Sequence, residues 1–174
     1  MKNKKMQQRL SEEVVDFINS RKSLQLSTIA DDGSPYASYA PFALGDECLY
    51  VLISEIAVHA INLQHNPKAS ILIIQDEDSA EELFARIRVN YSVDAEQLAV
   101  DSERWHAGIA VLSQRHGDRI DSLSQLSDFK LFMLKPTGGR FVKGFGRAYS
   151  LAGGTLAGEV LSHMSDGHKK REVA

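Results

Sequence analysis

Two arginines spaced two residues apart, Arg86 and Arg88, carry the clearest chemistry in the sequence. They lie within residues 83–93, a segment typical of a long β-strand, and residues two apart on a strand point to the same face. Guanidinium groups bind carboxylates and phosphates through paired hydrogen bonds, so such a face suits an anionic ligand. The pair could equally bond to the neighbouring acidic stretch at residues 76–82, and the residues alone leave both interpretations open.

The histidines near the C-terminus raise the question of a metal. His163, Asp166 and His168 lie close together in the sequence, but a spacing of five suits no helix face and no cysteine joins them. A zinc site is therefore not expected. Taken alone, His168 is best explained as a solvated histidine beside the basic residues Lys169, Lys170 and Arg171.

Two further polar residues stand at the starts of predicted strands. Ser23 precedes a strand over residues 24–29, and Asp128 precedes a strand over residues 129–135. Serine and aspartate are common where loops meet strands, because their side chains bond to nearby backbone groups. From the residues alone, both are interpreted as structural.

The composition bounds what the protein can be. With 174 residues, 43% hydrophobic and 25% charged, the chain is long enough for one domain with a substantial core. The net charge of −3 argues against broad nucleic-acid binding. No apolar run approaches the ~18–20 residues of a membrane span, and the basic start leads into a charged helix rather than a signal peptide. Cys48 is the only cysteine, which excludes an intramolecular disulfide and favours the cytoplasm.

The first half of the chain predicts a helix followed by a meander. Ser11 is a good N-cap, and apolar residues at helical spacing follow it, so a helix is expected over residues 10–20. Turn residues such as Asp32 and Gly33 then separate alternating segments. These segments predict an antiparallel meander of strands over residues 24–29, 36–44 and 48–53.

The second half predicts further strands and helices. Ser54 is expected to cap a short helix before Pro67, whose inward face carries His59. A strand over residues 69–75 is apolar enough to be buried on both faces. A helical region over residues 94–116 places Trp105 in the core or in a dimer interface. His106 and His116 are expected at the surface. Gly138 and Gly139 predict a turn between a strand over residues 129–135 and a short one over residues 140–142, and the chain loosens after Gly144.

This order of elements predicts a mainly β protein with flanking helices. A barrel is the natural way for several short antiparallel strands to avoid exposed sheet edges. Alternating strand–helix units are absent, so a doubly wound parallel sheet is not expected. Residues 1–150 are assigned to the barrel domain and residues 151–174 to a C-terminal segment.

Several motifs resemble the pyridoxamine-phosphate-oxidase-like, FMN-binding split barrels. They are Lys22-Ser23-Leu24-Gln25-Leu26-Ser27-Thr28, Asp32-Gly33-Ser34-Pro35 and Tyr39-Ala40-Pro41-Phe42. Other motifs are similar to the HugZ/HutZ haem-utilisation branch of that superfamily: Leu52-Ile53-Ser54, Ala57-Val58-His59-Ala60, Leu83-Phe84-Ala85-Arg86, residues 123–129, residues 141–149 and Gly167-His168-Lys169-Lys170. The resemblance extends from about Lys22 to Lys170. It implies an antiparallel split β-barrel that forms a homodimer.

The resemblance also implies a haem site and assigns residues to it. His168 corresponds to the axial ligand of the haem iron, and Asp128 to the partner that accepts the free N–H of that imidazole. Ser23 would hydrogen-bond to Asp128 of the same or of the other protomer. Arg86, Arg88 and Lys169 are candidates to bind the haem propionates or, in the flavin alternative, the phosphate of FMN. No C-x-x-C-H motif is present, so covalent haem attachment is excluded.

Three functions follow from this resemblance. The first is oxidative haem degradation that releases iron, with an external electron donor and a haem-delivering protein as partners. The second is haem carriage or storage with the same site and no turnover. The third is an FMN-dependent oxidoreductase, although the flavin site of the parent fold is generally not used in this branch. Nucleic acid and membrane are not expected as partners.

Overall fold

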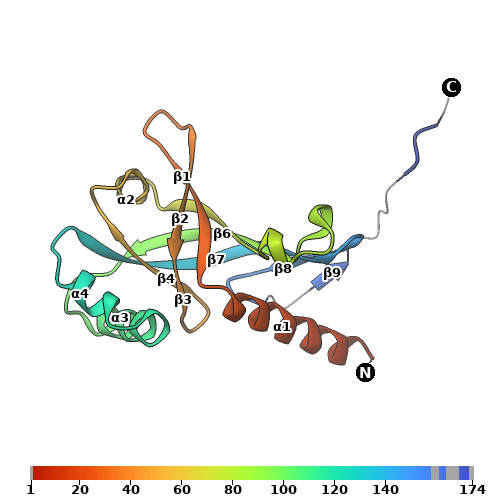
Figure 1. Cartoon of the computed structure of the whole chain (residues 1–174), viewed down its shortest axis with the longest axis horizontal. Helices are drawn as coiled ribbons and strands as arrows, with labels where there is room; N and C mark the ends of the chain where they lie inside the picture. Colours follow the sequence, from red (N-terminus) through yellow and green to blue (C-terminus); the bar gives the residue numbers. More distant parts are fainter. Residues whose placement is uncertain (1, 158–160, 164–168, 173–174) are drawn as a thin grey trace.

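The computed structural model describes residues 2–157, 161–163 and 169–172 (Figure 1). Its strands are β1 (Ser23–Ile29), β2 (Pro35–Pro41), β3 (Ala43–Leu44), β4 (Leu49–Ser54), β5 (Lys68–Ile74), β6 (Arg88–Gln97), β7 (Phe129–Gly144), β8 (Arg147–Ala152) and β9 (Leu161–His163). Its helices are α1 (Lys2–Ser20), α2 (Val58–His65), α3 (Glu103–His116) and α4 (Arg119–Ser124), with short 3₁₀ turns η1 (Glu77–Ser79) and η2 (Leu83–Ala85). Among these residues, no helix combines the length and the apolar character that a membrane span requires.

The strands form one antiparallel sheet that curls into a split barrel, as expected. The main order is β2-β1-β5-β6-β7-β4-β3, with β8 and β9 added beside β7. β2 and β3 lie at opposite edges of this order, yet only Phe42 separates them in the sequence. The chain therefore bends at Phe42 and joins the two edges, and this side chain is completely buried. The predicted three-strand meander is confirmed in part, since β1 pairs with β2 and β3 pairs with β4. The second strand of that prediction is divided at Phe42, and β4 pairs along its whole length with β7.

The first helix is longer than predicted. It begins at Lys2 rather than near residue 10, and Ser11 lies in its interior instead of capping it. Lysine, methionine and glutamine are strong helix formers, so the polar N-terminal residues extend the helix without a cap. Leu10, Val14 and Ile18 are buried and dock the helix on the barrel.

Three central strands also differ from expectation. β5 is buried on one face only, since Ile71 and Ile73 point inward while the outward residues are half-buried. β6 begins at Arg88 and continues to Gln97, so the residues that follow Asp94 are strand rather than helix.

Gly138 and Gly139 make no turn, because β7 runs through both of them. A Cβ at Gly139 would lie 2.4 Å from the Asn90 carbonyl oxygen and 2.7 Å from Cδ1 of Tyr91. The glycine therefore serves close packing of β7 against β6, and a bulge near Ser92 and Val93 adjusts the register.

Two helices have different starts from those predicted. α2 begins after Ala57, without a side-chain cap, and Ser54 bonds elsewhere. α3 has Ser102 as its N-cap, whose hydroxyl accepts the Trp105 amide at 3.1 Å, and it ends at Gly117 as predicted. Trp105 is buried with α3, α4 and the outer faces of β4 and β7 in a smaller apolar cluster.

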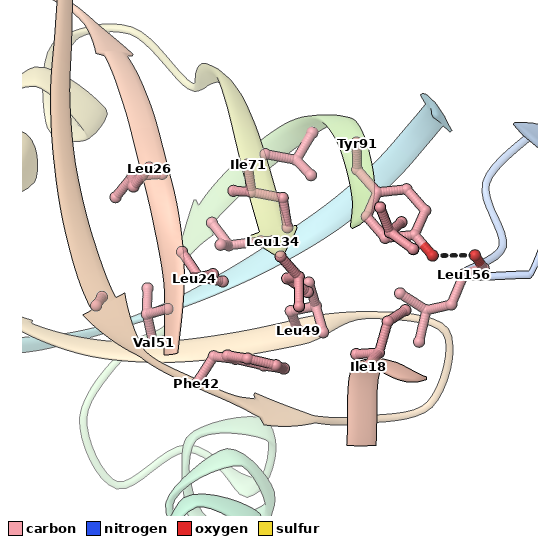
Figure 2. Close-up of a cluster of buried hydrophobic side chains, with 14 of the residues drawn as sticks. Ile18, Leu24, Leu26, Phe42, Leu49, Val51, Ile71, Tyr91, Leu134 and Leu156 are labelled. Atoms are coloured by element: carbon pink, nitrogen blue, oxygen red, sulfur yellow. Dashed lines mark hydrogen bonds between the residues drawn. The ribbon is translucent and has the colours of Figure 1, made fainter. Parts of the chain in front are cut away.

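The main core fills the barrel and reaches into the C-terminal part of the chain (Figure 2). It contains Leu151 and Leu156, so residues beyond position 150 pack with the barrel. The chain also forms β8 and β9 after Gly144, where a loose segment was expected. β8 crosses the boundary drawn at residue 150.

Candidate functional site

The outer face of the barrel carries two aligned rows of side chains. One row crosses five strands through the pairs Tyr39–Gln25, Gln25–Leu72, Leu72–Asn90 and Asn90–Arg140. Directly paired residues point to the same face of the sheet. Their neighbours in the sequence, Leu24, Ile71 and Phe141, point to the opposite face and are buried in the barrel. This row therefore lies outside the barrel and combines an aromatic, an amide, an apolar and a guanidinium side chain.

Two grooves lie along this outer face and meet at Leu72. One, of about 570 Å³, lies over β2, β1 and β5 and is lined by residues that include Gln25 and Tyr39. The other, of about 470 Å³, lies over β5, β6 and β7 and is lined by Leu72, Arg88, Asn90, Arg140 and Val142. Each is in the size range of sites for small molecules and cofactors.

The second groove holds two guanidinium groups. Arg88 donates from Nη1 to the Arg86 carbonyl oxygen at 2.9 Å and still lines the groove. The Arg140 guanidinium makes no hydrogen bond or ion pair with any described residue. Arg140 was missed by the sequence analysis because Gly138 and Gly139 were interpreted as a turn. Its alternation with Val142 on one face was the available signal.

Arg86 does not share a strand face with Arg88, contrary to the prediction. β6 starts only at Arg88, and Arg86 follows the 3₁₀ turn η2. Its guanidinium donates twice to the carbonyl oxygen of Gln75, through Nε at 2.8 Å and through Nη2. That carbonyl lies where the chain leaves β5, and Arg86 satisfies it. The sequence also left open that Arg86 bonds to the acidic stretch at residues 76–82. In the structure it is Arg21 that contacts this stretch, with its Nη1 3.0 Å from Oδ2 of Asp76.

Small residues form the second row on the same face. The pairs Ala37–Ser27, Ser27–Ser70, Ser70–Ser92 and Ser92–Gly138 run beside the first row. A Cβ on Gly138 would come no closer than 3.6 Å to another atom of this chain. This row leaves the floor flat, and Leu72 and Val142 add apolar surface beside the guanidinium groups. The face therefore suits a flat, largely apolar molecule with anionic groups.

Asp128 is held at the start of β7 by Ser54. The Ser54 hydroxyl donates to its Oδ2 at 2.6 Å, and the Glu55 amide donates to its carbonyl oxygen at 2.7 Å. Ser23 is exposed at the start of β1 opposite Pro41. Within one chain, Ser54 is thus the hydroxyl that fixes the Asp128 carboxylate.

Asp128 and Arg140 lie far apart within one chain. Asp128 immediately precedes β7, and Arg140 lies twelve residues later, toward the other end of that strand. At about 3.3 Å per residue, roughly 40 Å of strand separates them. The two residues therefore lie toward opposite ends of β7.

The proposed haem ligand His168 lies outside the described residues. Lys169 is described and exposed. Of the other histidines, His106 is exposed as expected, with its Nε2 3.6 Å from the Asp101 carboxylate. His116 was expected at the surface but is half-buried, and its Nε2 lies 2.7 Å from the Phe42 carbonyl oxygen.

His59 is half-buried at the end of the barrel. Its Nδ1 lies 2.8 Å from the Ser38 hydroxyl, and burial lowers the pKa of this imidazole. The Ser38 hydroxyl also donates to the Leu26 carbonyl oxygen at 3.4 Å, which leaves its oxygen to accept the Nδ1–H of the neutral ring. His59 is thus a satisfied structural histidine, in agreement with its predicted inward position.

Comparisons with known proteins agree with this architecture. The profile of the family described as pyridoxamine 5'-phosphate oxidase matches residues 10–143. A protein named haem oxygenase HutZ, from Vibrio cholerae, is 47% identical over 170 residues, which cover 98% of this chain and 96% of HutZ.

Solved structures give the same result. A crystal structure of Vibrio cholerae HutZ, described as a haem storage protein, has a TM-score of 0.70 and 48% identity, covering 73% of this chain and 89% of that chain. The crystal structure of Campylobacter jejuni ChuZ has a TM-score of 0.81 and 31% identity, covering 93% of this chain and 65% of that chain. By sequence and by fold, this chain belongs to the HugZ/HutZ branch of the pyridoxamine 5'-phosphate oxidase-like split barrels.

Proposed function

We propose that this protein binds haem on the outer face of its barrel and degrades it oxidatively, releasing iron. The observation that carries the proposal is the groove in which Arg88 and Arg140 flank the apolar residues Leu72 and Val142. Haem is a flat apolar ring with two carboxylates, and arginine binds carboxylates in a bidentate manner. The relatives named as haem oxygenase and haem storage protein support the same ligand.

Each residue has a distinct part in this proposal. Arg88 and Arg140 anchor the propionates, with Lys169 as an additional cation, while Leu72 and Val142 contact the apolar ring. His168 supplies the axial imidazole, and Asp128, oriented by Ser54, accepts its free N–H. Bound haem iron supplies the oxygen chemistry, with electrons from an external donor.

The site is assembled from two copies of the chain. Because roughly 40 Å of strand separates Asp128 from Arg140, one copy contributes the guanidinium groove and the other the Asp128 end. The flat row of small residues is the surface on which a second sheet can pack closely. The working form is therefore a homodimer.

The single cysteine, Cys48, is buried and reduced, which favours a location in the cytoplasm. A haem-delivering protein would supply the ligand there.

The decisive experiment titrates the purified apo-protein with haem and, separately, with FMN. We expect a Soret band that saturates with haem and no comparable binding of FMN. His168→Ala should change the ferric spectrum and weaken haem binding, because the axial ligand is lost. His106→Ala is the matched control and should behave as the wild type, since His106 is exposed and lines neither groove. A wild-type spectrum and affinity in His168→Ala would contradict the assignment, and preferential FMN binding would favour the flavin function.

A second measurement separates degradation from storage. The haem complex is incubated aerobically with a reductant while the Soret band and released iron are followed. Degradation predicts loss of the band together with an open-chain product and free iron. A stable Soret band under these conditions would instead support carriage or storage, as the description of the HutZ crystal structure suggests.

A further inference from the structure

Helix α1 packs on the barrel with one face and leaves the opposite face to solvent. Its buried residues Leu10, Val14 and Ile18 contact the core, and the helix lies at the periphery of the molecule (Figure 1). Residues three and four apart on a helix lie above one another, so a run with those spacings forms one stripe. Such a run faces away from the barrel, and every member of it is exposed: Lys5, Arg9, Glu12 and Asp16. We call it the outer stripe of α1.

The charges of the outer stripe are divided along its length. The first half is basic, with Lys5 and Arg9, and the second half is acidic, with Glu12 and Asp16. Each like-charged pair is spaced by four residues, a spacing at which like charges repel one another. The order is also the reverse of what the helix dipole favours, since α1 has no acidic residue in its first turn and no basic residue in its last turn. The outer stripe therefore destabilises an isolated helix.

Contacts within the chain do not neutralise the outer stripe. Lys5 and Asp16 make no hydrogen bond or ion pair with any residue that the structure describes. Arg9 is 83% exposed, and its Nε lies 3.8 Å from Oε1 of Glu13, a long ion pair. The Glu12 carboxylate accepts a hydrogen bond at 3.2 Å from the uncharged side-chain amide four residues before it. Neutralisation of the stripe thus requires charges from another molecule.

We propose that α1 pairs in an antiparallel manner with α1 of a second copy of this chain. The stripe is complementary to itself when one helix is reversed about a point midway between residues 10 and 11. Lys5 of one copy then faces Asp16 of the other copy, and Arg9 faces Glu12. A two-fold axis forms each of these ion pairs twice. The antiparallel arrangement also sets the positive end of each helix dipole beside the negative end of the other.

This contact is separate from the haem groove. Phe17 of α1 lies against Phe141, with 6.5 Å between the ring centroids, and Phe141 points into the barrel. Arg140, beside it on β7, lines the groove on the outer face. The sheet therefore lies between α1 and the groove, so the pairing of α1 does not depend on haem. Exposed ion pairs are individually weak, and the association is accordingly reversible and sensitive to salt.

A membrane fits the outer stripe less well than a second copy does. A helix that lies on a membrane buries a broad apolar face among the lipids. The outer stripe contains charged residues alone, and its acidic half would be repelled by anionic lipids.

Cross-linking with a zero-length carbodiimide tests the pairing in a mixture of isotope-labelled and unlabelled full-length protein. Lys5 and Asp16 are eleven residues apart, about 16 Å along one helix, which is too far for a cross-link within one chain. We expect a Lys5–Asp16 cross-link that joins labelled to unlabelled chains. Raising the salt from about 0.1 M to 1 M should reduce its yield about tenfold.

The internal control is the ion pair between Lys143 Nζ and Glu13 Oε2, at 2.6 Å on the same helix. It should cross-link within one chain and so prove that the reagent reaches α1. If this control forms while Lys5 and Asp16 are not joined between chains, the proposal is overturned.

Charge reversal provides a second, independent test. Lys5→Glu with Arg9→Glu makes the stripe wholly acidic, and Glu12→Lys with Asp16→Lys makes it wholly basic. Both changes agree with the helix dipole, so the helix is retained, which circular dichroism checks. In sedimentation, the average mass of the wild type should rise with concentration above that of either variant. An equimolar mixture of the two variants should recover this rise, because an acidic stripe then faces a basic one.

The matched control is Asp121→Lys, which reverses an exposed charge on α4 and should sediment as the wild type does. Variants with a uniform stripe that associate like the wild type would overturn the proposal. A mixture of the two variants that fails to recover the association would overturn it as well.

Discussion

Arg86 and Arg140 differ in one respect that decides which of them a ligand can use. The guanidinium of Arg86 is engaged by the Gln75 carbonyl, whereas that of Arg140 faces the groove without a bond to any described residue. A hydrogen bond to a charged group contributes about 1.5–3 kcal/mol, so Arg140→Gln should weaken haem binding roughly 10- to 100-fold. Soret titration measures this change.

The controls for Arg140 separate charge from geometry. Arg140→Lys keeps the charge but loses the planar fork, so an intermediate affinity is expected. Arg119→Gln removes an exposed guanidinium from the start of α4 and should leave the affinity unchanged. Equal affinities in Arg140→Gln and the wild type would show that the propionates lie elsewhere.

His59 gives the folded protein a predictable response to acid. Burial lowers the pKa of this imidazole below its ordinary value of 6.5. The unfolded chain therefore binds a proton at higher pH than the folded chain does, and the free energy of unfolding decreases as the pH falls below about 6.5. The stabilising contribution of neutral His59 is fully present above that pH.

Denaturant titrations at several pH values test this response. His59→Gln should lose less stability than the wild type as the pH falls from neutrality to about 5.5, because glutamine does not titrate. His106→Gln is the control and should follow the wild-type curve, since its side chain is 61% exposed. Parallel pH profiles for the wild type and His59→Gln would show that His59 is not responsible.

Among the elements, β7 offers a matched pair of adjacent glycines on opposite faces. A Cβ at Gly139 would meet the backbone of β6 at 2.4 Å, whereas one at Gly138 meets nothing within 3.5 Å. Gly139→Ala should therefore reduce the free energy of unfolding by about 1–3 kcal/mol. Gly138→Ala should change it by no more than about 0.5 kcal/mol. Guanidinium denaturation compares the two, and equal effects would refute the close packing of β7 on Tyr91.

For the whole molecule, the prediction is a homodimer that packs on its row of small residues. Sedimentation should give twice the chain mass of 19.3 kDa. Ser70→Arg places a long charged side chain in the middle of that row and should yield monomers that bind haem poorly. Ser122→Arg on α4 is the matched control and should stay dimeric. A wild-type monomer at micromolar concentration would contradict both the assembly and the shared site.

Much of this protein was determined locally by its sequence. Alternation of apolar residues located β1, turn residues located much of β4, and a continuous apolar run located β5. Glycine located the end of α3. These signals involve only neighbouring residues. Motifs distributed along the chain identified the family and made His168 and Asp128 candidates for the haem site. The start of α1 was misplaced because Ser11 resembled a cap within a segment of strong helix formers.

The tertiary structure decided which side chains meet. Arg140 joins the groove because β7 pairs with β6 in a register that sets it opposite Asn90, fifty residues earlier in the sequence. Gly139 makes no turn and instead leaves room for the ring of Tyr91 on β6. The Arg86 guanidinium donates to the Gln75 carbonyl oxygen at the end of β5. Local patterns carry no information about such partners, because register depends on how distant strands bury their apolar faces together. For the same reason, only the fold shows that Asp128 and Arg140 lie toward opposite ends of one continuous strand.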